Sequence, residues 1–423
     1  MPETLSNHVN NTNSNSENKY KTDLENDESA PPLRRSAFRA LVQDFGPIWF
    51  TWCMNAGALG LLTHQSPYQF HGLEIISTVF YVFDLTLFIV FSVIFILRFT
   101  IFRSSAYREI VSQQTELTLC ACWPIAFLTL TSLTPVICSN AYWGRHAFTI
   151  LGYVMWWSSA TWSLLVLFWV FITLIRQHDA NDRRLPTTII LPAVSVATVA
   201  VTGGSVVSLS YDVSPRLAVP VIVVSFMMVG IGILLGLMLS TYLFHAFLAQ
   251  GWPAPAMTAS TFILVGPMGQ SAAALLQLGM AAREYGKFGG YNKGSFLTAE
   301  AAVVLETACV LIALILAGLG VIWSILAIYA MIERALQRKL FWTPGWNAII
   351  FPMATLTTSM NLFAVEMDSP AFRVITVVLI IVLLFVFLLN LAFTIWKVVK
   401  GELLIVKEDW RGKKQLEERQ KEK

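Results

Sequence analysis

Long apolar stretches alternate with short polar segments from about Gly46 to Trp396. Each stretch holds roughly the 20 apolar residues that a helix needs to cross a hydrocarbon core, where only helices and closed barrels satisfy their backbone. The pattern predicts an all-α polytopic membrane protein with ten transmembrane helices. We expect the spans at 46–63, 75–97, 117–138, 147–175, 186–208, 217–245, 257–282, 298–332, 345–365 and 374–396.

Composition and charge agree with a membrane protein. Hydrophobic residues make up 56% of the chain and charged residues 13%, about half the charged share of a soluble domain. All Lys and Arg lie outside the spans, and only Asp84, Glu300 and Glu306 lie inside. Ten crossings place both termini on one side. The tails carry 5 basic residues before Gly46 and 9 after Trp396, so the positive-inside rule predicts that both termini are cytosolic.

The chain divides into a tail at 1–45, a membrane domain at 46–396 and a charged tail at 397–423. The first tail is rich in Asn and Ser and has no apolar face, which predicts a disordered cytosolic segment. The second predicts a solvated helix, with contact to anionic lipid as the alternative. The cysteines have neither disulfide nor zinc spacing. They are predicted to be buried core thiols within the spans: Cys53, Cys120, Cys122, Cys138 and Cys309.

Prolines and small polar residues gather in the odd-numbered spans. Pro124, Pro192, Pro267 and Pro352 lie in spans three, five, seven and nine, where we expect them away from the first turn and therefore kinking the helix. Span one has Gly57 instead, and the even spans are bulky and apolar. The chain therefore predicts five tandem hairpins, each a broken helix followed by a straight one. Small, polar helices suit an interior, so we expect the odd helices to surround a central pore.

This inner ring is neutral in the middle of its spans, without Lys, Arg or His and without the carboxylates typical of cation channels. The prolines are expected to leave backbone groups of the odd spans without hydrogen-bond partners. Together with neutral side-chain donors, these groups favour a pore that holds anions weakly. For any single hydroxyl, helix–helix packing is the competing interpretation. The candidate pore-lining residues are Thr51, Asn55, Gly57, Pro124, Pro192, Thr202, Ser205, Gly266, Pro267, Gln270, Pro352 and Thr355.

Three further residues suggest specific roles. Phe351 precedes Pro352, and a kink there could turn its ring toward the axis as a hydrophobic plug; core packing is the alternative. Asp84 and Glu306 lie on even spans, where a carboxylate costs several kcal/mol unless it is paired or protonated. Each is either a proton-coupling site or a hydrogen-bonding partner of a neighbouring helix. The sequence has no HExxH, P-loop or GxSxG motif in a strand context, so we expect no enzyme and no cofactor.

Several stretches resemble a known family. They are WPIAFLTL (123–130), YVMWW (153–157), IILPAVSVATVAVTGG (189–204), LVGPMGQ (264–270), GWNAIIFPMAT (345–355) and AFRVI (371–375). The chain is similar to the tellurite-resistance/dicarboxylate transporter family, which includes slow anion channels, and most similar to its fungal sulfite efflux pumps.

The resemblance implies ten helices with five-fold pseudosymmetry around a central pore, and a homotrimer with one pore per subunit. It places the family's gating phenylalanine at Phe351 and implies export of sulfite or bisulfite across the plasma membrane. The sequence departs from the family pattern where Asn55, Ser271 and Ala354 stand in place of glycines. These side chains would narrow the inner ring and bear on pore width and substrate.

Our first hypothesis is a plasma-membrane anion exporter or channel, in which the membrane potential drives the anion outward. A C4-dicarboxylate (malate)/proton transporter is the second, with Glu306 or Asp84 as the coupling residue. The third is a membrane signalling protein that does not transport. The expected partners are a small anion, the lipid bilayer and two further copies of the chain, without nucleic acid.

Overall fold

A computed structural model describes residues 37–177 and 185–403. Most of the predicted disordered segment and most of the charged C-terminal tail lie outside the described residues. The chain separates into two compact units, Met1–Leu41 and Val42–Lys423. Of the first, only the start of helix α2, Ala37–Asp44, is described. All the remaining described helices belong to the second unit.

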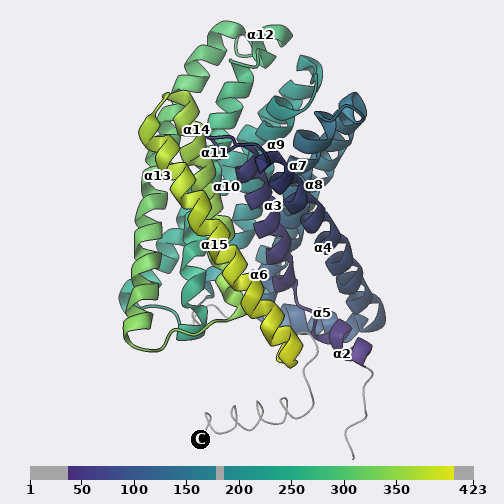
Figure 1. Cartoon of the computed structure of the whole chain (residues 1–423), viewed down its shortest axis with the longest axis vertical. Helices are drawn as coiled ribbons and strands as arrows, with labels where there is room; N and C mark the ends of the chain where they lie inside the picture. The colour runs from purple at the N-terminus through teal and green to yellow at the C-terminus, as the bar shows by residue number, and fades with distance from the viewer. Residues whose placement is uncertain (1–36, 178–184, 404–423) are drawn as a thin grey trace, which may run out of the picture. The chain divides into compact units, whose positions relative to one another are not determined.

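The described residues are helical, and their β structure is confined to one isolated bridge between Lys293 and Leu297. Five straight helices correspond to the even spans (Figure 1): α4 Leu73–Ile101, α8 Arg145–Gln177, α10 Pro215–Gln250, α13 Ala299–Leu336 and α15 Pro370–Lys400. Two short helices lie in connections at opposite ends of these rods, α5 Arg103–Ser112 and α12 Lys287–Tyr291.

The odd spans are composite. Four of them begin with a 3-10 helix and continue as an α-helix, and the third span begins with a short α-helix and ends in a π-helical turn. The segments are η1 Pro47–Trp49 with α3 Phe50–His64; α6 Gln114–Leu119 with α7 Cys122–Leu133 and η2 Thr134–Ser139; η3 Thr187–Ile190 with α9 Leu191–Leu209; η4 Pro255–Leu264 with α11 Val265–Ala282; and η5 Pro344–Ile349 with α14 Ile350–Glu366.

This composite structure corrects the predicted role of the prolines. Pro124, Pro267 and Pro352 are each the third residue of their α-helix, and Pro192 is the second residue of α9. The first four N–H groups of an α-helix have no partner within it, so proline is tolerated there. The expectation that these prolines lie away from a first turn is therefore wrong. Each marks the point where the preceding segment passes into an α-helix.

Nine of the described segments are long and apolar enough to cross a membrane. The prediction of ten counts one more, the first span, which consists of η1 and the 15-residue α3 and is not among the nine. The five cysteines are buried and free, as predicted for core thiols.

Burial separates the two kinds of segment. In the most apolar eighteen residues of the third, fifth, seventh and ninth spans, 83%, 100%, 100% and 78% are buried. In the straight helices the corresponding shares run from 11% for α4 to 39% for α8, α10 and α13. Of the 15 residues of α3, 12 are buried. The composite segments therefore form the interior of the described membrane domain, and the straight helices form its surface.

Contacts between the interior helices run in a closed cycle. Helix α3 contacts α7, α7 contacts α9, α9 contacts α11, α11 contacts α14, and α14 contacts α3 again. We call these five helices the inner ring. Each straight helix packs behind it: α4 on α3, α8 and α10 on α9, α13 on α11, and α15 on α14. Figure 1 shows α4 and α13 at opposite margins and α15 in front.

Polar side chains join neighbouring helices of the inner ring. Such bonds suit helices in a membrane, where apolar burial alone gives no drive to associate. Ser132 Oγ donates to Thr202 Oγ1 at 3.1 Å, Ser205 Oγ donates to Gln277 Oε1 at 3.1 Å, and Gln270 Nε2 donates to Thr198 Oγ1 at 2.8 Å.

Glycine allows the closest approach in this ring. A Cβ on Gly269 of α11 would lie 2.6 Å from the backbone nitrogen of Leu356 and 2.3 Å from Thr355 Oγ1. A Cβ on Gly57 of α3 would lie 2.4 Å from Thr129 Cβ and 2.5 Å from Asp84 Oδ2. Any larger residue at either position would push two helices apart.

Candidate functional site

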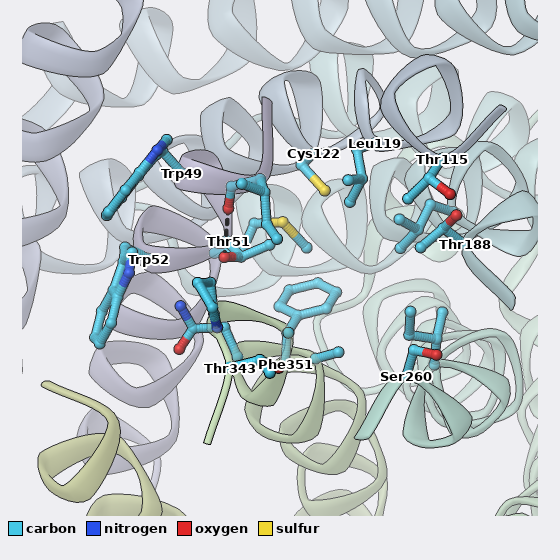
Figure 2. A pocket seen from close by; sticks show the side chains of 18 of the residues that line it. Trp49, Thr51, Trp52, Thr115, Leu119, Cys122, Thr188, Ser260, Thr343 and Phe351 are labelled. Atoms are coloured by element: carbon cyan, nitrogen blue, oxygen red, sulfur yellow. Dashed lines mark hydrogen bonds between the residues drawn. The ribbon is translucent and has the colours of Figure 1, made fainter. Parts of the chain in front are cut away.

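A cavity of about 450 Å³ lies where the N-terminal parts of the inner segments meet (Figure 2). All five odd spans contribute to its wall, for example through Trp52, Leu119, Thr188, Ser260 and Phe351. The wall is mainly apolar, with hydroxyl groups spaced among tryptophan, methionine and leucine side chains. The cavity thus belongs to the ring as a whole.

Hydroxyl pairs hold the walls of this cavity in register. The hydroxyls of Thr118 and Thr188 are 2.7 Å apart and join α6 to η3. Those of Thr187 and Ser260 are hydrogen-bonded between η3 and η4. Thr343, the residue before η5, donates to the carbonyl of Ala256 in η4 at 3.2 Å. The partners come from successive odd spans, so hydroxyl groups join neighbouring spans at this end of the ring.

Phe351 is the second residue of α14 and points into the cavity, as Figure 2 shows. Its side chain is only 4% exposed. The 3-10 turn that ends at Ile349 and the following Pro352 fix the direction of this first turn of α14. The ring therefore occupies space between the inner helices, away from the straight outer helices.

Two predicted polar residues also line the cavity, but their donors serve the protein's own backbone. The Thr51 hydroxyl donates to the carbonyl of Ile48 at 2.6 Å. The Asn55 amide donates to the carbonyl of Asn347 at 3.1 Å and thereby joins α3 to η5. The buried Oδ1 of Asn55 has no hydrogen-bond partner among the described residues. In this arrangement Thr51 has no hydroxyl proton left for an anion.

The structure brings only part of the predicted set together. Thr51, Asn55, Gly266, Phe351 and Pro352 line the cavity. The Thr355 hydroxyl donates to the carbonyl of Pro352 at 2.7 Å. The bonds of Thr202, Ser205 and Gln270 follow the helix-packing interpretation of the hydroxyls, whereas the bond of Thr355 lies within α14. The predicted residues outside the cavity wall are Gly57, Pro124, Pro192, Thr202, Ser205, Pro267, Gln270 and Thr355.

Asn55, Ser271 and Ala354, which the resemblance predicts to stand in place of glycines, are all buried in the inner ring. The amide of Asn55 reaches across to η5. The Ser271 hydroxyl is buried and has no partner among the described residues. Ala354 is 1% exposed. Each therefore occupies interior volume that a glycine would leave open.

Sequence reasoning missed the carboxylates at the cavity. Asp44, Glu116 and Glu402 line it, and the described lining contains no Lys, Arg or His. Glu402 is paired with Lys397 at 3.3 Å. Glu116 has one buried oxygen, Oε2, without a hydrogen-bond partner in the described structure. The position of Glu116, one residue before the predicted third span, was the signal in the sequence that could have placed it at the cavity. The cavity therefore has a partly negative rim in front of a neutral wall.

Asp84 inserts from α4 into the inner ring. It is fully buried, and its Oδ2 accepts a hydrogen bond from Thr129 of α7 at 3.0 Å. Gly57 of α3 makes room for this carboxyl group. The other oxygen, Oδ1, has no partner among the described residues. Asp84 thus joins three helices, which is the hydrogen-bonding role expected as one of its two alternatives.

Glu306 forms an ion pair that the sequence did not predict. Its carboxylate on α13 accepts a hydrogen bond from Arg283, which follows α11. Glu306 is buried, whereas the Arg283 side chain is half exposed. This hydrogen bond, together with the charge of Glu306, raises the pKa of Arg283. Because the partner lies in a connecting segment, a search within the spans could not find it.

Buried composite helices that surround a cavity, inside a layer of straight apolar helices, define a multi-pass membrane transport protein. Residues 44–395 match the family described as the voltage-dependent anion channel. The match covers most of the chain, so the protein belongs to this family of anion transporters.

Individual relatives are named as transporters of two different substrates. The chain is 26% identical to a sulfite efflux pump of Trichophyton rubrum and 25% identical to one of Arthroderma benhamiae, in each case over 378 residues that cover 89% of this chain and 97% of the relative. It is also 23% identical over 331 residues to a malic acid transport protein of Schizosaccharomyces pombe, which covers 77% of this chain and 72% of the relative. The family and these relatives are transporters or channels, in agreement with the absence of enzyme motifs in the sequence.

Proposed function

We propose that this protein exports sulfite or bisulfite through a central pore, and that the inner ring is the wall of that pore. In this proposal the chain crosses the membrane ten times as five hairpins, with α3 completing its crossing together with η1. The closed cycle of contacts among α3, α7, α9, α11 and α14 carries the proposal, because a ring closed by neighbouring hairpins encloses one axis. Ring and outer layer together make up the membrane domain 46–396.

A small anion of low charge fits the chemistry of the cavity. Its described lining has no cation that would balance two negative charges, so a dianion such as malate, or fully deprotonated sulfite, would lose hydration without compensation, and bisulfite is the favoured form. Weak sites favour conduction, since an ion must leave as easily as it enters. The sulfite efflux pumps among the relatives favour sulfite or bisulfite as the anion.

The proposed gate is Phe351. Its ring stands in the cavity at the start of α14, where an apolar group would block a hydrated anion. Movement of this ring, or of the η5–α14 junction that holds it, would open the path. The hydroxyl and amide groups farther along the inner ring, among them Thr202, Ser205 and Gln270, would then line it after a change of partners.

The direction of transport follows from the proposed orientation. Asp44 and Glu402 both line the cavity, so the two ends of the described chain lie at the same mouth. The basic tails favour the cytosol for that mouth. A membrane potential that is negative inside drives an anion outward with about 2.3 kcal/mol per charge per 100 mV, so export needs no proton coupling. We propose the plasma membrane as the location and a homotrimer as the assembly, both from the family resemblance.

Anion-substitution electrophysiology on the purified full-length protein in planar bilayers tests this function. In sulfite solutions we expect currents carried mainly by bisulfite, with smaller currents for chloride and nitrate and very small currents for malate. The currents should reverse at the equilibrium potential of the permeant anion. Absence of anion current at every potential would contradict the proposal and favour a signalling protein.

Malate transport is the second candidate, because a malic acid transport protein is among the relatives. It would need a titratable coupling group. The pairing of Glu306 with Arg283 and the hydrogen bond of Asp84 to Thr129 give both carboxylates a structural role instead. Uptake of labelled malate into proteoliposomes that depends on a pH gradient would favour this candidate over sulfite export.

A further inference from the structure

A second hollow lies on the outside of the membrane domain, away from the inner-ring cavity. It is an open groove of about 1370 Å³ at the junction of α4 and α5. The end of α4, the start of α5 and Trp123 of α7 form it. None of these residues lines the inner-ring cavity, so the groove is a separate feature.

The floor of the groove is apolar and continues the outer face of α4. Ile96 is 50% exposed, and Phe99 and Trp123 pack partly against the core. The indole N–H of Trp123 donates to Ser92 at 2.9 Å, so the floor has no unsatisfied donor there. Because only 11% of the most apolar part of α4 is buried, this face meets the acyl chains in a protein of this family. Lipid therefore reaches the groove without crossing any protein wall.

The rim of the groove is polar and carries a positive charge. Arg103, Ser104, Ser105 and Tyr107 surround it on the first turns of α5. Arg103 is exposed and has neither an ion pair nor a hydrogen-bond partner among the described residues. The groove thus passes from apolar to cationic at the end of α4, where the hydrocarbon layer gives way to headgroups.

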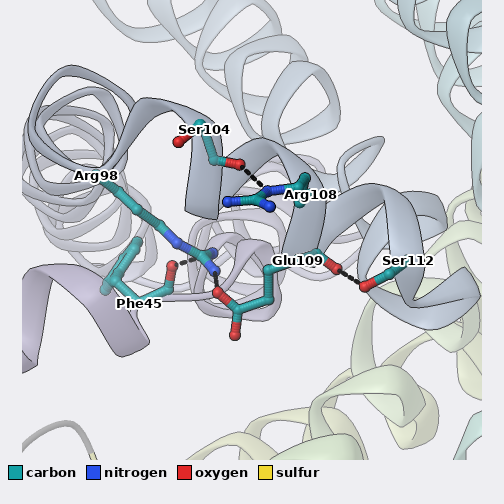
Figure 3. Close-up of polar contacts among 6 residues, drawn as sticks. All are labelled: Phe45, Arg98, Ser104, Arg108, Glu109 and Ser112. Atoms are coloured by element: carbon teal, nitrogen blue, oxygen red, sulfur yellow. Dashed lines mark hydrogen bonds and ion pairs between the residues drawn. The ribbon is translucent and has the colours of Figure 1, made fainter.

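A buried arginine fixes the junction that presents this rim (Figure 3). Arg98 of α4 donates to the carbonyl of Phe45 at 2.8 Å and to Glu109 of α5 at 2.8 Å. Arg108 donates to the carbonyl of Ser104 at 3.2 Å. Glu109 therefore neutralises Arg98 inside the junction, whereas the charge of Arg103 remains available outside. A fixed α5 holds Arg103 in one place relative to the apolar floor.

We propose that this groove binds an anionic phospholipid, with the headgroup phosphate at Arg103 and the hydroxyls of Ser104 and Ser105, and an acyl chain over Ile96 and Phe99. Arginine forms forked hydrogen bonds with phosphate, and basic pockets beside membrane helices on the cytosolic side bind acidic headgroups. The match of an apolar floor and a cationic rim selects lipid over a water-soluble anion, which would leave the floor exposed. The site is independent of the anion that the protein transports.

The test uses native mass spectrometry of the full-length protein in detergent, titrated with phosphatidylserine or phosphatidylcholine. We expect phosphatidylserine to bind more tightly, and Arg103→Gln to weaken its binding about fivefold, the share of one basic residue near a membrane surface. Phosphatidylcholine binding should change little in this variant. The matched control is Arg338→Gln, which removes an exposed arginine after α13 and should leave both affinities unchanged.

Three results would overturn the site. Equal weakening by Arg103→Gln and Arg338→Gln would mean that net charge alone attracts the lipid. Full competition by glycerol phosphate would mean that the ligand is a free phosphate and that the floor plays no part. A shift in subunit number caused by Ile96→Asn, with unchanged lipid affinity, would mean that a second copy of the chain covers the groove. The melting temperature of each variant shows that it is folded.

Discussion

Helices α9 and α15 have opposite positions in the same membrane domain. All of the most apolar eighteen residues in the fifth span, which contains α9, are buried, whereas 28% are buried in α15. Yet α9 carries serine, threonine and paired glycines, and α15 carries mainly valine, leucine, isoleucine and phenylalanine. In lipid the bulky apolar helix gains nothing by burial, while small residues allow close packing and hydroxyls need partners. The inner ring is therefore the more polar layer.

The two layers also differ in how much change they tolerate. Inner helices are joined by side-chain hydrogen bonds and by glycines in near contact with neighbouring backbones. Outer helices present side chains to lipid, where added volume displaces only acyl chains. Four pairs of substitutions, from the largest expected effect to the smallest, test this difference.

Gly269→Ala should cause the largest loss. The added Cβ would meet the Leu356 backbone at 2.6 Å, and backbone cannot move aside without separating α11 from α14. Overpacking of this kind costs about 3 kcal/mol. The matched control is Gly318→Ala on α13, where no atom lies within 4 Å of the new Cβ. Thermal unfolding of the detergent-solubilised protein, followed by size-exclusion chromatography, measures both. Equal melting temperatures of the Gly269→Ala and Gly318→Ala proteins would show that the inner and outer layers tolerate added volume equally.

Phe351→Ala should raise basal anion conductance about tenfold, which corresponds to removing a barrier of ~1.4 kcal/mol. The physical reason is the loss of an apolar ring from the cavity. Phe385→Ala is the control, because Phe385 is 66% exposed on the outer helix α15. Single-channel recording in planar bilayers provides the measurement. A Phe351→Ala protein that conducts no more than the wild type would show that the gate lies elsewhere.

Glu116→Gln should increase anion current about threefold at low ionic strength, and less at high salt, because removing a negative charge from the cavity reduces repulsion that salt otherwise screens. Glu300→Gln, on the exposed first turn of α13, removes the same charge away from the cavity and should have no effect. Current–voltage curves at two salt concentrations test both variants. An effect of Glu116→Gln that does not depend on salt would point to a change of structure instead of charge.

Asp84→Asn should have the smallest effect, about 0.5 kcal/mol of stability, because the amide oxygen still accepts the hydrogen bond from Thr129. Sulfite flux in proteoliposomes should remain within the range of the wild type. Asp84→Leu serves as the contrast, since it leaves the Thr129 hydroxyl without this acceptor and should lower the melting temperature. A stable Asp84→Asn protein without flux would instead make Asp84 a proton-coupling residue.

Much of the layered arrangement was predictable from local chemistry. The alternation of small, proline-containing spans with bulky ones predicted which helices are buried, because side-chain volume and hydrogen bonding decide packing in lipid. The burial of all five cysteines followed from their place within apolar spans. The position of Phe351 before Pro352 suggested either a plug at the axis or core packing; its ring lines the cavity, and its role as a gate stays a prediction.

Other features depend on residues that are far apart in the sequence. The partner of Glu306 is Arg283 in a connecting segment, and the amide of Asn55 binds the carbonyl of Asn347 across almost the whole chain. The place of the prolines also required the structure, because a preceding 3-10 helix turns what looks like the middle of a span into the first turn of an α-helix.

By itself, then, the sequence determined that the protein lies in a membrane, its class of fold and its family, because hydropathy, residue volume and short motifs are local properties. Only the tertiary structure decided which donors are already occupied, where the carboxylates lie around the cavity, and which helices of the expected ring contact one another. These depend on distances between segments 70 or more residues apart, such as Thr118 and Thr188, and no local pattern specifies such distances.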